Sequence, residues 1–93
     1  MFLLNFAVNS EMAPYQTAHG ALARRMSEAH GNIASVNEAL ARGTMNEAEA
    51  QTWLTFYTRI ARYTQEARAT LIEAEVAILT LAKEARRLIT AGI

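Results

Sequence analysis

TMNEAEAQTWLTFYTRIARYTQEARATLIEAEVAILTLAKEARRLITA, residues 44–91, decides the fold of this 93-residue chain. The stretch contains neither Gly nor Pro, the two residues that most destabilise a helix interior. Its apolar positions alternate in steps of four and three, which fills the a and d positions of a heptad repeat. We therefore predict one uninterrupted, coiled-coil-like helix over residues 45–91. The predicted seam is Trp53, Tyr57, Ile60, Thr64, Ala67, Leu71, Ala74, Ile78, Leu81, Ala85 and Leu88.

Both ends of this helix carry further signals. Thr44 and Glu47 have the spacing of a capping box, in which each side chain bonds the backbone amide of the other. Glu49 follows in the first turn, and Arg86 and Arg87 stand near the end. This is the charge order that the helix dipole favours. The ends therefore agree with the periodicity.

A shorter helix is predicted before it, over residues 14–42. Pro14 suits a first helical turn, where its missing N–H is no loss, and Gly43 suits the left-handed position after a helix. The tight connection at Gly43 and Thr44 predicts that the two helices run antiparallel. The fold class is therefore an all-α helical hairpin in one domain, residues 1–93. The predicted seam of helix one is Tyr15, His19, Leu22, Met26, Ala29, Ile33, Val36 and Leu40.

The second helix is too long for the first to cover. About 45 residues make a helix about 68 Å long, so we expect an elongated molecule. Pairing outward from the connection sets Leu22 near Gln65 and Tyr15 near Leu71 or Ile72, where helix one is predicted to run out. Beyond that point the second helix would overhang its partner.

The overhang carries a second apolar row, made of Ala69, Ile72, Val76 and Leu79, on a face other than the seam. Four such side chains hiding about 400 Å² would contribute at most about 10 kcal/mol, as much as the net stability of a small domain. We expect this row to be covered, because a large exposed apolar patch commonly marks an interface.

Two covers are open. Residues 1–13 form an apolar docking segment that can fold back along the overhang, and the overhang of a second copy can pack against it. The segment has more apolar groups than one groove can hold, so we expect both covers to contribute and the hairpin to form an oligomeric helical bundle. The predicted interface residues are Phe2, Leu3, Phe6, Ile72, Val76, Leu79 and Ile89.

Composition excludes several functions. Nine basic and nine acidic side chains cancel, so the chain has no basic excess with which to bind nucleic acid. The absence of Cys excludes disulfides, thiolate metal sites and Cys nucleophiles. Residues 1–8 are apolar but too short to span a bilayer and lack the positive region of a signal peptide. We expect a soluble protein without integral membrane insertion, cytoplasmic by default.

Candidate chemistry is sparse. His19 and His30 are three helical turns apart, about 16 Å, and cannot share one metal ion. Arg25 and His30 have an Arg-x4-His spacing that resembles the active-site motif of HEPN-type helical ribonucleases, which would imply RNA cleavage. The resemblance covers six residues, and Met26 stands where that family has a polar residue. In a continuous helix His30 also lies about 140° round the axis from Arg25. We therefore expect no enzyme activity, cofactor or metal.

The sequence thus predicts a non-enzymatic structural or assembly subunit that acts by helix-mediated homo-oligomerisation. The alternative is a small protein-binding module, a chaperone or an inhibitor, that presents its apolar helix face to a different protein.

Overall fold

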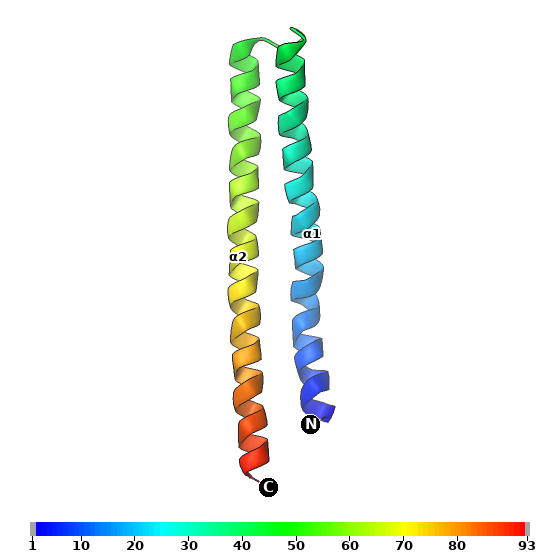
Figure 1. Ribbon diagram of the computed structural model, residues 1–93, viewed down its shortest axis with the longest axis vertical. Helices are drawn as coiled ribbons and strands as arrows, with labels where there is room; N and C mark the ends of the chain where they lie inside the picture. Colours follow the sequence, from blue (N-terminus) through cyan, green and yellow to red (C-terminus); the bar gives the residue numbers. More distant parts are fainter. Residues whose placement is uncertain (1, 93) are drawn as a thin grey trace.

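The computed structural model describes residues 2–92, which form two helices, α1 (Phe2–Ala41) and α2 (Glu47–Ala91). The helices lie side by side and antiparallel, with both termini at one end (Figure 1). The predicted all-α hairpin is confirmed. It measures 72 × 16 × 13 Å and its radius of gyration is 21.0 Å, against about 12 Å for a compact domain of this length.

The connection between the helices is set by Gly43. Its φ of 76° is the left-handed conformation predicted for this position. The amide of Gly43 donates to the carbonyl of Leu40 at 3.1 Å, and the amide of Thr44 donates to the carbonyl of Ala39 at 3.0 Å. These two bonds form a Schellman motif, which satisfies the last carbonyls of α1 and lets the chain reverse within five residues, 42–46.

The predicted capping box at Thr44 is wrong. The N-cap of α2 is Asn46, whose Oδ1 accepts a hydrogen bond from the amide of Glu49 at 2.8 Å. Thr44 belongs instead to the end of α1, because its hydroxyl donates to the carbonyl of Ala39 at 3.1 Å. Asn is as good an N-cap as Thr, and the Schellman motif has already used the backbone amide of Thr44. The helix therefore starts at Glu47.

The predicted start of helix one at Pro14 is also wrong, and residues 2–13 are not a separate docking segment. Helix α1 begins at Phe2 and continues through Pro14. A proline inside a helix removes one hydrogen bond and costs about 3 kcal/mol. Leu4, Val8 and Met12 offset that cost, because they continue the inward face of α1 in steps of four and pack along α2. Helix one therefore does not run out near Leu71.

The inward face of α1 confirms the predicted seam and extends it to the N-terminal end. His19 is half-buried in the seam, and the steps of four and three continue on both sides of it. Leu40, at the connection, is the exception, being 36% exposed. The inward positions are Leu4, Val8, Met12, Tyr15, His19, Leu22, Met26, Ala29, Ile33 and Val36.

The inward face of α2 corrects its predicted seam. Every second predicted position, in the series from Tyr57 to Ala85 in steps of seven, does face α1. The intervening positions that face α1 most directly lie one residue later than predicted, although Ile60 and Ala74 remain half-buried. The inward positions are Ala50, Leu54, Tyr57, Ala61, Thr64, Arg68, Leu71, Glu75, Ile78, Ala82 and Ala85.

The core between the helices is thin. No large side chain of residues 3–92 is fully buried. The accessible surface is 6951 Å², whereas a compact protein of 10.3 kDa exposes about 5,400 Å². The hairpin therefore exposes about 1,600 Å² more than a compact monomer of its mass. The buried apolar residues are Met12, Ala29, Val36, Ala50 and Ala82.

Candidate interaction surface

One exposed apolar row runs along the C-terminal half of α2. We call Ile72, Val76 and Leu79 the ridge; these residues are 54%, 56% and 49% exposed. They stand in steps of four and three beside the inward positions Leu71 and Ile78. About half of the surface of each residue is therefore bare.

A second apolar row runs along the other flank of α2. Sequence reasoning placed these residues in the seam, but Leu81 and Leu88 are 68% and 61% exposed. Because Ala82 rather than Leu81 packs against α1, the helix is rotated so that this row turns outward. We call it the flank row. It has one residue in every heptad: Trp53, Ile60, Ala67, Ala74, Leu81 and Leu88.

At the open end of the hairpin the flank row borders a groove between the helices. The groove has a volume of about 370 Å³. Small Ala side chains on both helices leave it hollow, and its one charged member is Glu11, which is exposed. The lining residues are Leu4, Ala7, Val8, Glu11, Ile78, Leu81, Ala82 and Ala85.

The ridge and the groove lie on opposite sides of the hairpin. Consecutive residues of a helix are about 100° apart round its axis. Leu79 is two residues before Leu81 and so lies about 200° from it. Phe6 on α1 is likewise two residues from Leu4, which lines the groove. Phe6 and Leu79 therefore share the side that faces away from the groove.

The structure brings some of the predicted interface residues together. Leu3 and Phe6 are 79% and 65% exposed and lie beside the C-terminal part of α2, where the Arg86 guanidinium donates to Asn5 Oδ1 at 3.4 Å. Ile89, 44% exposed, lies near the end of α2, which projects past α1 (Figure 1). The side chain of Phe2 lies outside the described part of the chain.

An aromatic cluster occupies the loop end of the flank row. The rings of Trp53 and Tyr57 stack with centroids 5.8 Å apart, and Phe56 meets Tyr57 edge-on at 5.3 Å. Tyr57 is half-buried, but Trp53, Phe56 and Tyr63 are exposed. The outer rings of the cluster extend the exposed apolar flank toward the connection.

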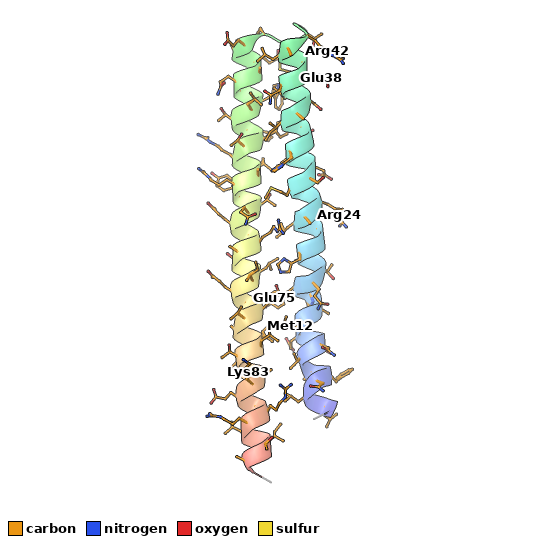
Figure 2. All side chains as sticks on the ribbon, viewed as in Figure 1. Met12, Arg24, Glu38, Arg42, Glu75 and Lys83 are labelled. Carbon is orange, nitrogen blue, oxygen red and sulfur yellow. The ribbon has the colours of Figure 1, made fainter. Side chains whose placement is uncertain are left out.

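One polar pair interrupts the apolar contact between the helices. His19 Nε2 donates a hydrogen bond to Glu75 Oε1, and the two side chains retain only 28% and 20% of their exposure. Figure 2 shows Glu75 and Met12 in the space between the helices. The sequence placed His19 in the seam of helix one, but the predicted seam of helix two had Ala74 and not its neighbour Glu75. The only signal for a polar partner was His19 itself, a polar residue at a position where an apolar one is expected.

The remaining polar groups lie on the surface. Arg25 is exposed and pairs with Glu28 at 3.9 Å, and His30 is exposed as well. Arg62 pairs with Glu66, and Arg87 pairs with Glu84. Exposed pairs of this kind contribute little to stability. Residues 2–92 contain no group of three or more metal-ligating side chains and no helix long and apolar enough to cross a bilayer.

Comparison with known proteins gives no relative: no family model, curated protein or solved structure matches the chain.

Proposed function

We propose that this chain is a non-enzymatic structural or assembly subunit that acts by homo-oligomerisation, its hairpins packing through further coiled-coil contacts. The observation that carries the proposal is the exposed apolar surface on both flanks of α2. The side chains of the ridge and the two leucines of the flank row, Leu81 and Leu88, are all about half exposed or more.

The energetic argument is direct. Covering the exposed half of the ridge and its neighbours, about 200 Å² of apolar surface, would contribute about 5 kcal/mol per chain. Two helices alone bury no large side chain fully in the described residues, so the hairpin gains much of its core by association.

A protein-binding module would use the same surface. The neutral balance of charge, nine groups of each sign, gives no preference for an acidic or basic partner, whereas the excess area suits repeated contact with copies of the chain itself. We therefore favour self-association.

The test is the mass of the purified chain in solution, measured by light scattering, for the unmodified protein and for Val76→Glu with Leu79→Glu. We expect a stable multimer of 10.3 kDa chains, and a clear fall in mass for the double variant with helicity retained in circular dichroism. Thr80→Glu is the matched control, because exposed Thr80 stands next to Leu79 in the sequence but on the polar back of α2. A monomeric unmodified chain, or an unchanged mass in the double variant, would overturn the proposal.

A further inference from the structure

We infer that the ridge of one copy seats in the groove of the next, so that copies assemble side by side, through two unlike surfaces, into a ring or filament of more than two copies. This inference rests on the proposed self-association and names its partner surface. The observation behind it is that one hairpin carries a convex apolar row and a hollow apolar groove on opposite sides.

The shapes are complementary. The ridge presents the branched side chains Ile72, Val76 and Leu79, each about half exposed. The groove is lined by Ala7, Ala82 and Ala85 and remains hollow, with a volume of about 370 Å³. If two ridges packed against each other, their branched side chains would collide, and both grooves would stay empty.

The two surfaces lie near the same end of the hairpin but are offset along its axis. The ridge spans residues 72–79 of α2 and the groove spans residues 78–85, so their midpoints are about 9 Å apart. Copies can therefore stack side by side, each displaced by about 9 Å from the last. Such a contact does not close on itself in a pair, because the ridge of the first copy and the groove of the last stay free; it extends into a ring or filament.

The area is sufficient for two contacts per chain. A standard protein interface buries about 800 Å² on each partner, and the hairpin exposes about 1,600 Å² beyond a compact monomer of its mass. One symmetric dimer contact would use one side only. A ridge-to-groove contact covers both sides of every internal copy.

Charge is complementary too. Lys83 stands seven residues after Val76, in the same row, and is exposed on α2 (Figure 2). Glu11 is the charged residue at the groove. Among residues 2–92 neither group is in an ion pair within its own chain. The two surfaces therefore carry single charges of opposite sign.

A mixing experiment tests the inference with two variants of the full chain. The ridge variant is Val76→Glu with Leu79→Glu. The groove variant is Leu81→Glu, in the lining of the groove, with Leu88→Glu, the next residue of the flank row. The replaced leucines of the groove variant are more than half exposed, so the hairpin should fold, which circular dichroism checks. Thr80→Glu is again the matched control and should assemble like the unmodified chain.

We expect the unmodified chain to exceed two copies. Each variant alone should be a monomer of 10.3 kDa, with self-association weakened at least about 100-fold. An equal mixture should give a one-to-one complex of twice that mass, because one intact ridge meets one intact groove.

Two results would overturn the inference while leaving the proposed function standing. One is that either variant forms a dimer with itself, since this would show that like surfaces pair. The other is that the mixture stays monomeric although the unmodified chain assembles. A monomeric unmodified chain would overturn the proposed function as well.

Discussion

Two stretches of α2 that are three heptads apart occupy the same rows of the helix and carry opposite chemistry. The stretch near the connection is polar, and the stretch near the open end is apolar. Both lie beside an inward face with the same steps of four and three. The loop-end residues are Gln51, Thr55 and Thr58, and the open-end residues are Ile72, Val76 and Leu79.

The difference shows that the seam does not determine the chemistry of the outer surface. The same seam packs α1 on α2 in both halves of the hairpin, so this packing does not explain why an exposed apolar ridge is present near the open end and absent near the connection. On the side of the ridge, the exposed side chains of the loop-end half are polar, and water can solvate them. The exposed side chains of the open-end half are hydrocarbon, which only further protein can cover.

The largest expected effect comes from giving the open end the chemistry of the loop end. Ile72→Gln, Val76→Thr and Leu79→Thr together remove the apolar ridge and keep the seam. We expect the free energy of association to become about 3 kcal/mol less favourable, which raises the dissociation constant more than 100-fold. The helical content should be preserved. Sedimentation equilibrium measures the change, with Thr80→Gln as the control on the polar back of the helix. An unchanged mass would show that the ridge is not a contact.

The reciprocal change should have the opposite effect. Gln51→Ile, Thr55→Val and Thr58→Leu extend the ridge toward the connection. We expect a higher average mass at a given concentration, since more apolar surface is available to neighbouring copies. Light scattering over a dilution series measures it. If the mass stays the same, association is fixed by something other than apolar area on this side.

The seam offers a smaller test, because Glu75 stands where the loop-end half has Leu54, three heptads earlier. Glu75→Ala leaves His19 without its hydrogen-bond acceptor. Breaking a fully buried pair costs 3–5 kcal/mol; here both groups keep some exposure, so we expect about 2 kcal/mol.

Urea unfolding at one fixed protein concentration measures this loss, and exposed Glu73→Ala is the matched control. Replacing the pair together, His19→Leu with Glu75→Leu, should restore the stability or raise it, because apolar side chains can replace a buried polar pair. A double variant as unstable as Glu75→Ala would contradict the assigned partnership.

The smallest effect concerns the two glycines inside α1. A Cβ at Gly20 or Gly31 would meet nothing within 4 Å, and Ala stabilises an exposed helix position by about 0.5–1 kcal/mol relative to Gly. We expect Gly20→Ala and Gly31→Ala to raise the melting temperature by similar amounts, since neither lies on the ridge or the groove. A loss at Gly20 alone would indicate a close contact with another copy there.

The hairpin itself could be predicted because its signals were strong and local. The long stretch without breakers and the glycine at the connection fixed two antiparallel helices. Pro14 led to a wrong start for helix one, because the preference of proline for a first helical turn is a local effect. The packing of Leu4, Val8 and Met12 against α2 is a long-range effect, and it extends the helix to Phe2.

The surface was predictable in part. Ile72, Val76 and Leu79 stood out as an extra row and are exposed, as expected for a row outside the seam. Leu81 and Leu88 were assigned to the seam because large apolar residues fit that position best. The true inward positions include Arg68, Glu75 and Ala82, and neither charge nor small size identifies a buried position in a sequence. The groove was therefore not predictable.

The central claim is that this hairpin completes its apolar packing with further copies of itself. Sedimentation equilibrium of the unmodified chain tests this most directly, because mass is measured independently of the elongated shape. We predict a mass of more than two 10.3 kDa chains that falls toward one chain on dilution. A folded, helical chain that remains at 10.3 kDa across the whole concentration range would contradict the account.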